Sequence, residues 1–117
     1  MLPHPDTDEL TLTGVLAALS DPVRLGIVRQ VADAGTTEVI CQEVGGEMPK
    51  STRSHHLKAL REAGVIRTVP QGRERVVTLR TDDLDKRFPG LLAAVLEAAP
   101  EAASGASPGA GAAVQTT

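Results

Sequence analysis

The segment KSTRSHHLKALREAGVIRTVPQGRERVVTL, residues 50–79, constrains the fold of this chain more than any other stretch. Ser51 is a good cap for the start of a helix, and Gly64 is a favoured residue just past a helix end. Two short runs rich in β-branched residues follow at 65–69 and 75–79, with the turn-forming sequence PQGRE between them. This order predicts a helix that leads directly into a β-hairpin with a basic tip.

Charge is distributed unevenly along the chain, whose formal net charge is −3. Residues 1–49 carry two arginines against eight acids, a balance of −6, and residues 81–117 have a balance of −3. Residues 50–80 carry eight lysines and arginines against two acids, a balance of +6. A local block of this kind neutralises phosphates, so the segment predicts a nucleic-acid-facing surface. The alternative is a charged helix and hairpin that are merely solvated.

Helical patterns on both sides of this segment predict four more helices. The first begins at residues 7–8, and the second follows the capping sequence SDP at 20–22, where proline's missing N–H costs nothing. A short helix is expected over 38–44, and a last helix begins at Thr81 and is kinked or restarted at Pro89. The predicted fold class is therefore mainly α with a small two-stranded β-hairpin, about five helices in all.

Composition divides the chain into a flexible arm at 1–7, one domain at 8–99 and a disordered Ala/Gly/Ser/Pro-rich tail at 100–117. With no Trp, no Tyr and one Phe, the core must be aliphatic. No apolar run approaches the ~20 residues of a membrane span. The N-terminus lacks the basic and apolar regions of a signal peptide, and a single cysteine fits a reducing compartment. These features predict a cytoplasmic protein.

Apolar residues recur at helical spacing in the first and last helices. In a domain of this size such a stripe packs either on the chain's own core or on a second subunit, and the pattern alone leaves both open. The stripes comprise Leu12, Val15, Leu16 and Leu19 in the first helix, and Leu84, Phe88, Leu91, Leu92, Val95 and Leu96 in the last.

The sequence resembles the ArsR/SmtB family of bacterial winged helix-turn-helix repressors over roughly residues 8–98. The likeness is carried by LSDPVRLGIV (19–28), STRSHHLKALREAGVI (51–66) and the wing QGRERVVTL (71–79). It implies a homodimer that binds an inverted repeat in double-stranded operator DNA. It also implies that the first and last helices form the dimer interface, through Leu12, Val15, Leu16, Leu19, Phe88, Leu91, Leu92, Val95 and Leu96.

The helix over 51–64 has a core face anchored by Leu57 and Leu60, and its other side faces outward. Hydroxyls and backbone N–H groups at the helix start suit phosphate or base-edge contacts, and arginines near the wing suit contacts to the DNA backbone. The predicted DNA-binding residues are Lys50, Ser51, Thr52, Arg53, Ser54, His55, Lys58, Arg67, Arg73 and Arg75.

Arg53 and the two adjacent histidines need separate interpretation. The family commonly has a small or apolar residue at the position of Arg53, which here either reaches out to DNA, the interpretation we favour, or marks a looser helix start. Neighbouring helical side chains point ~100° apart, so His55 and His56 cannot share one metal ion in comfortable geometry. The resemblance suggests that His55 contacts DNA and that His56 makes a half-buried structural hydrogen bond.

Members of this family often sense metals, but neither of two familiar site types transfers whole. The place of a Cys-x-Cys pair has only Cys41, and no histidine follows His56. A nitrogen/oxygen site for nickel or zinc remains a candidate at the N-terminus, with a solvated arm as the alternative. Its ligands would be His4, Asp6, Asp8 and Glu9. Cys41 is either a small core residue or a redox-responsive thiol.

No enzymatic arrangement is evident in the sequence. Ser54 and His55 diverge on a helix and do not form a nucleophile–base pair, and there is no glycine-rich phosphate loop. The prediction is a dimeric, sequence-specific transcriptional regulator, responding either to a metal or small-molecule effector or to none. A dimeric protein-interaction module with a basic face is the alternative outside DNA binding.

Overall fold

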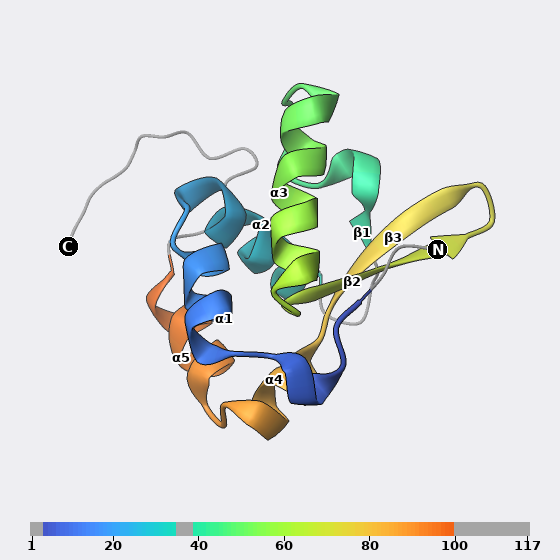
Figure 1. The fold of residues 1–117 in the computed structure, drawn as a ribbon. Coiled ribbons are helices and arrows are strands. Elements are labelled where there is room, and N and C mark those ends of the chain that lie inside the picture. The colour runs from blue at the N-terminus through green and yellow to red at the C-terminus, as the bar shows by residue number, and fades with distance from the viewer. Residues whose placement is uncertain (1–3, 35–38, 100–117) are drawn as a thin grey trace.

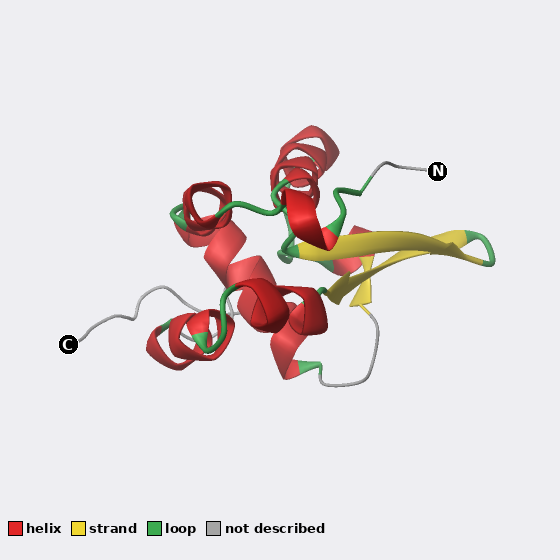
Figure 2. Ribbon diagram, turned by 60° about the horizontal axis from the view of Figure 1, so that its bottom comes forward, coloured by secondary structure: helices red, strands yellow, loops and turns green. Residues whose placement is uncertain are grey.

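The computed structural model describes residues 4–34 and 39–99, which form a layer of helices beside a small antiparallel sheet (Figure 1). The strand order is β1-β3-β2, and the β2–β3 hairpin extends beyond the helices (Figure 2). In chain order the elements are the 3-10 turn η1 (Thr7–Glu9), α1 (Leu12–Leu19), α2 (Pro22–Asp33), β1 (Val39–Ile40), the 3-10 turn η2 (Cys41–Glu43), α3 (Lys50–Glu62), β2 (Ile66–Gln71), β3 (Glu74–Leu79), α4 (Thr81–Arg87) and α5 (Leu91–Ala98).

The start of α2 follows the predicted capping pattern. The carboxylate of Asp21 accepts hydrogen bonds from the backbone N–H groups of Val23, at 2.8 Å, and Arg24, at 3.1 Å. Pro22 is the first helical residue, where no N–H is needed. The N–H of Arg24 is the main cause that lowers the pKa of the Asp21 carboxyl, because it stabilises the charged form.

The helix predicted over 38–44 is not present in the described part of this segment, residues 39–44. Val39 and Ile40 form β1, which pairs with Val77 and Val76 of β3, and only a single 3-10 turn follows. Each of these two cross-strand pairs joins two β-branched side chains, which favours the sheet over a short isolated helix. The sheet consequently has three strands, where a two-stranded hairpin was expected.

A tight junction at Gly64 joins α3 to β2. Gly64 has φ +85°, and its N–H donates to the carbonyl of Arg61, while the Val65 N–H donates to that of Leu60. Such a left-handed residue after a helix suits glycine, as the sequence predicted. The cap expected at Ser51 is not formed, because α3 begins one residue earlier, at Lys50, and its start has no side-chain cap hydrogen bond.

The hairpin is longer and its turn tighter than the sequence suggested. β2 and β3 pair from Ile66–Leu79 to Gln71–Glu74, leaving only Gly72 and Arg73 in the turn. Pro70 lies within β2, which is tolerated because β2 is an edge strand.

The first predicted helix is divided in the structure, whereas the break expected in the last one at Pro89 is present. The first predicted helix is split into η1 and α1, and α1 begins at Leu12 with Thr11 as its cap. The last one restarts after Pro89, since Gly90 at φ +82° separates α4 from α5. Restarting the helix turns the apolar stripe, so that Leu84 and Leu92 are buried while its other members are only partly covered.

The core is aliphatic, as the composition required, and it contains part of each predicted dimer stripe. Val15, Leu19 and Leu92 are buried within the single chain. Leu12 and Leu16, in contrast, remain 46% and 43% exposed. No helix in the described residues is long and apolar enough to cross a membrane.

We predict that Gly64→Ala lowers the free energy of unfolding by about 3 kcal/mol. An L-residue in the left-handed region costs ~1–2 kcal/mol, and overpacking adds ~1–3 kcal/mol, because the new Cβ would overlap the side chain of Leu10. Urea unfolding monitored by circular dichroism measures the change.

Gly90→Ala is the matched control, since Gly90 has nearly the same φ but nothing near its added Cβ. It should cost only the backbone part. Equal losses for the two variants would mean that the contact with Leu10 is unimportant.

Candidate nucleic-acid interface

A groove of about 820 Å³ lies between α3 and the β2–β3 hairpin. The α3 residues that line it recur every three or four positions, so they share one helix face. The hairpin contributes Thr68 and Arg75, which the register places on the same face of the sheet. The lining residues are Cys41, Gln42, Lys50, Arg53, Ser54, Leu57, Lys58, Arg61, Thr68, Arg73, Glu74 and Arg75.

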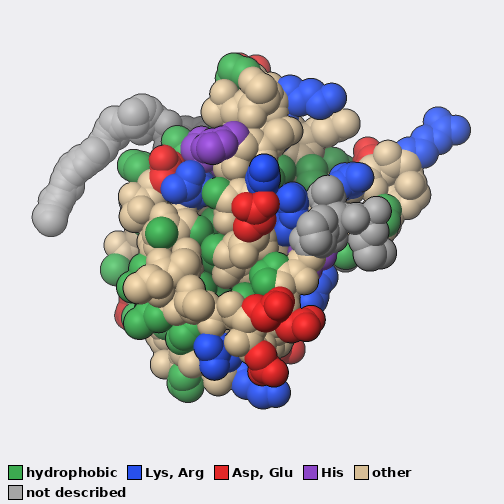
Figure 3. Space-filling view, viewed as in Figure 1, with side chains coloured by type: hydrophobic (Ala, Val, Ile, Leu, Met, Phe, Trp, Pro, Cys, Tyr) green, Lys and Arg blue, Asp and Glu red, His purple; other side chains and the backbone are tan. Residues whose placement is uncertain are grey.

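Positive charge dominates this groove. Glu74 is the only carboxylate among the lining residues just named, and six of them are lysine or arginine. Lys and Arg side chains lie over α3 and reach the hairpin tip, whereas carboxylates gather over the N-terminal segment (Figure 3). Charge sorted in this way gives an acidic chain one face whose field attracts phosphates.

The predicted DNA-binding residues fall into three groups in the structure: those lining the groove, those exposed beside it on α3, and Arg67 on β2. Lys50, Arg53, Ser54, Lys58, Arg73 and Arg75 line the groove. The remaining ones on α3 are exposed beside it, at Ser51, Thr52 and His55. Arg67, on β2, does not line the groove and forms an ion pair of 3.7 Å with Asp83.

Arg53 lines the groove but is also bonded to the loop before α3, so its contact with DNA stays a prediction. Its Nε donates to the carbonyl of Val44 at 3.0 Å, and one terminal nitrogen donates to that of Gly46 at 2.9 Å. These bonds satisfy two carbonyls of the loop before α3 and hold that loop against the helix. The arginine at this unusual position therefore has a structural task.

The two histidines lie in different environments. His55 is exposed, while His56 is buried with its Nδ1 3.4 Å from a terminal nitrogen of Arg24. The Nε of Arg24 donates to the carbonyl of Ala18 at 2.7 Å. Arg24 on α2 therefore joins the end of α1 to the middle of α3, which helps to fix the direction of the helix that faces the groove.

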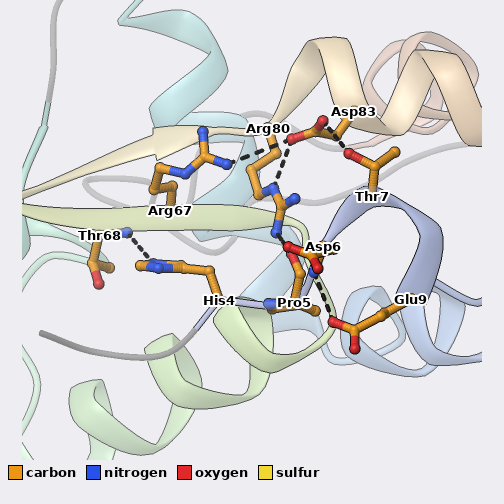
Figure 4. Close-up of polar contacts among 9 residues, drawn as sticks. All are labelled: His4, Pro5, Asp6, Thr7, Glu9, Arg67, Thr68, Arg80 and Asp83. Atoms are coloured by element: carbon orange, nitrogen blue, oxygen red, sulfur yellow. Dashed lines mark hydrogen bonds and ion pairs between the residues drawn. The ribbon is translucent and has the colours of Figure 1, made fainter.

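A second polar cluster connects the base of the hairpin to the N-terminal segment and α4 (Figure 4). Buried Arg80 donates to Asp83 at 2.9 Å and to the carbonyl of Pro5 at 2.7 Å. The hydroxyl of Thr7 donates to Asp83 at 2.6 Å. The Thr7 hydroxyl first, and then Arg80, lower the pKa of the Asp83 carboxyl.

His4 lies against the edge of the hairpin. Its Nε2 accepts the backbone N–H of Thr68 at 3.1 Å (Figure 4). Burial, followed by the charges of Arg67, Arg61 and Arg80, lowers the pKa of His4 below its ordinary value of 6.5. Residues 4–7 are thus joined to the hairpin base, whereas the sequence suggested a separate flexible arm.

The candidate nickel or zinc site is not assembled. In residues 4–34 and 39–99, no group of three or more His, Cys, Asp or Glu side chains is placed to hold a metal ion. The imidazole of His4 is engaged with Thr68, and the carboxylate of Glu9 accepts the backbone N–H of Asp6 at 2.8 Å. These two local bonds engage the side chains of His4 and Glu9, two of the four candidate ligands.

Cys41 is a half-buried free cysteine in the groove lining. Burial raises the pKa of its thiol, and nearby Arg75 offsets this only in part. A raised pKa leaves little reactive thiolate at neutral pH, which favours the interpretation of Cys41 as a packing residue over a redox sensor.

Known proteins share this arrangement. Residues 19–69, which span α2 and α3 and reach into β2, match the family model of a helix-turn-helix domain. The HTH-type transcriptional regulator YceK of Bacillus subtilis (strain 168) is 39% identical over 88 residues, covering 74% of this chain and 87% of that protein. The crystal structure of an ArsR family transcriptional regulator superposes with a TM-score of 0.57 and 25% identity, covering 74% of this chain and 92% of the other.

This chain belongs to the ArsR-like family of helix-turn-helix transcriptional regulators. An ArsR-like regulator from Rhodococcus sp. RHA1 gives a similar match, with a TM-score of 0.54, 27% identity, and coverage of 74% of this chain and 80% of that one. The winged helix-turn-helix fold and the family predicted from the sequence are confirmed.

Several polar residues of this ArsR-like regulator were missed by the sequence analysis. Arg61 and Thr68 were not among the predicted site residues, although both line the groove. Arg80 and Asp83 lie just three positions apart at a strand–helix boundary, a spacing that could have suggested their ion pair. No local signal indicated that Arg61 and Thr68 would be buried.

We predict that the stability of this ArsR-like regulator falls as the pH is lowered from about 7 to about 5 because His4 must be neutral to accept the Thr68 N–H. Its pKa is lower in the folded protein than in the unfolded chain. Between these two values the unfolded chain binds more protons, so stability is present above pH 6.5 and is lost below it. Urea unfolding across this range measures the effect.

His4→Gln should flatten this pH dependence, since a side-chain amide accepts the N–H at either pH. The matched control is His55→Gln, which removes an exposed histidine and should retain the wild-type profile. If His4→Gln behaves like the wild type, another group causes the pH dependence.

Proposed function

We propose that this ArsR-like regulator binds operator DNA as a homodimer in the cytoplasm and recognises a specific sequence. The observation that carries the proposal is the groove between α3 and the hairpin, with six basic residues in its lining against one acid. The start of α3 adds exposed hydroxyls beside this charge. A helix bearing short polar side chains next to a basic ribbon suits a major groove flanked by phosphates.

The two parts of the surface have different tasks in this proposal. Ser51, Thr52 and His55 on α3 contact base edges and discriminate between sequences, because they are exposed donors or acceptors on a rigid helix. Lys58, together with Arg73 at the tip of the hairpin, contacts the phosphate backbone and sets the position of the helix. We include no metal effector, since the described residues bring no ligand set together.

The exposed part of α1 supports a dimer. Leu12, Leu16 and Val23 are exposed large apolar residues, and Leu12 and Leu16 lie one turn apart on one helix. Partly buried Phe88, Leu91, Val95 and Leu96 add apolar surface from α5 and the preceding loop. A two-fold dimer through these residues would present two copies of α3 to half-sites ~34–36 Å apart.

We predict that Arg73→Ala weakens binding to every duplex by a similar factor. It should also lower the magnitude of the salt slope, the change of log affinity with log salt concentration, by about one for each phosphate that the variant no longer neutralises. The operator is first selected from a random duplex library, and anisotropy titrations from about 50 to about 200 mM salt then give affinities. The wild type should prefer its operator over random DNA by at least ~10³-fold.

Lys86→Ala provides the control, because Lys86 is exposed on α4 and does not line the groove. Its salt slope should stay near that of the wild type. Equal affinity of the wild type for all duplexes would exclude sequence-specific regulation. Failure to bind any duplex would leave an acidic protein partner as the alternative. A change of base preference in Arg73→Ala would contradict the assignment of the wing to the backbone.

We predict that Leu16→Glu weakens dimerisation by at least about tenfold, since burying one leucine contributes roughly 1.5–3 kcal/mol and a charge in its place opposes burial. Sedimentation equilibrium gives the dissociation constant. Thr13→Glu adds the same charge at an exposed position of the same helix and should retain the dimer. Equal weakening by both variants, or by neither, would place the interface elsewhere.

A further inference from the structure

Arg61 is a buried arginine without a counter-ion in the described residues. It lies in the last turn of α3 and is 9% exposed, and its Nε has no hydrogen-bond partner. No ion pair to Arg61 is formed within residues 4–34 and 39–99. Buried Arg80, in contrast, is satisfied by Asp83 and by the carbonyl of Pro5. A guanidinium is always charged, so burial without an acceptor is unfavourable and points to a missing partner.

Thr68 supplies a second orphaned group that lines the same groove. The residue as a whole is 5% exposed, and its Oγ1 is buried without a hydrogen-bond partner in the described part of the chain. Its backbone N–H is already bound by His4, so the hydroxyl is the polar group left over. A guanidinium has only donors, and a hydroxyl can donate as well as accept, so one acceptor placed between them can satisfy both groups.

The surroundings favour an acceptor with negative charge. Lys50, Lys58 and Arg75 line the groove along with Arg61 and Thr68. Cations of this density repel one another unless an anion lies between them. The planar guanidinium of arginine can donate two parallel hydrogen bonds to two oxygens of one phosphate. A charged acceptor of this kind binds it more strongly than a neutral acceptor does.

We infer that Arg61 and Thr68 form a phosphate-binding site in the groove between α3 and the hairpin. A phosphate can come from two sources. If the proposed function holds, a helix in the major groove and a wing beside the next minor groove leave one DNA strand between them, and its backbone passes over this groove. The other source is a small phosphorylated molecule, for which the groove volume of about 820 Å³ is adequate.

The site is tested by titrating inorganic phosphate into the full-length protein and following the Arg61 Nε–H and Thr68 amide by nuclear magnetic resonance. Both signals should shift and saturate. Thr68→Val removes the hydroxyl and retains the shape, and Arg61→Gln removes the charge. Each should weaken phosphate binding by about tenfold or more, the effect of removing one charge-assisted hydrogen bond.

Lys86→Gln is the matched control, since it removes one positive charge outside the groove and should bind phosphate like the wild type. Thr68→Val also removes an unsatisfied buried hydroxyl, so it should fold at least as stably as the wild type. Absence of saturable shifts in the wild type would overturn the site. Unchanged phosphate affinity in Thr68→Val and Arg61→Gln, or equal losses in Lys86→Gln, would overturn it as well.

A duplex-DNA arm identifies the source of the phosphate. Weaker duplex binding by Thr68→Val than by the wild type assigns the site to the DNA backbone. Unchanged duplex binding, with phosphate affinity lost, assigns it to a small phosphorylated molecule. A wild type that binds phosphate and no duplex supports the site and contradicts the proposed function. If Arg73→Ala weakens duplex binding while Thr68→Val leaves phosphate affinity unchanged, the proposed function is supported and the site is overturned.

Discussion

The direction in which the chain leaves α3 controls how the β2–β3 hairpin lies against that helix. Because Gly64 adopts a left-handed conformation, the chain reverses within two residues and Val65 hydrogen-bonds back onto the helix. The hairpin is thereby held at a fixed angle to α3, and the groove between them exists only because of that angle. Leu10 packs where any side chain at position 64 would have to lie, so the junction is also tied to the N-terminal half of the core.

The helix α3 satisfies two sets of constraints at once. One edge, with Leu57 and Leu60, is buried in the core and fixes the position of the helix. Arg24 meets it from α2 through His56, and Arg53 holds the loop that precedes it. The exposed surface of α3 is therefore presented by a rigid element. Base discrimination requires this rigidity, since ordering a loosely held helix on binding would cost conformational entropy.

The parts of the structure that follow from local patterns could be predicted from sequence, and those that depend on distant partners could not. Glycine at the end of α3 and the β-branched runs on either side of the turn residues are local signals. Both elements form, and the hairpin is longer than expected. Val39 and Ile40 were assigned to a helix because only pairing with β3, far along the chain, makes them a strand. Likewise, the burial of Arg61 and Thr68 depends on how α3 packs against β2, which no local pattern records. The His4 contact depends on the chain folding back to the hairpin edge.

The contact between His4 and Thr68 also bears on solubility. β2 is one of the two outer strands of the sheet, and an open strand edge is a template on which a second chain can add by backbone hydrogen bonding. Here the donor at Thr68 is occupied by an imidazole, and two residues on, Pro70 has no N–H to offer. The β2 edge is thus a poor partner for another strand, so the exposed hairpin is protected from edge-to-edge association along this strand.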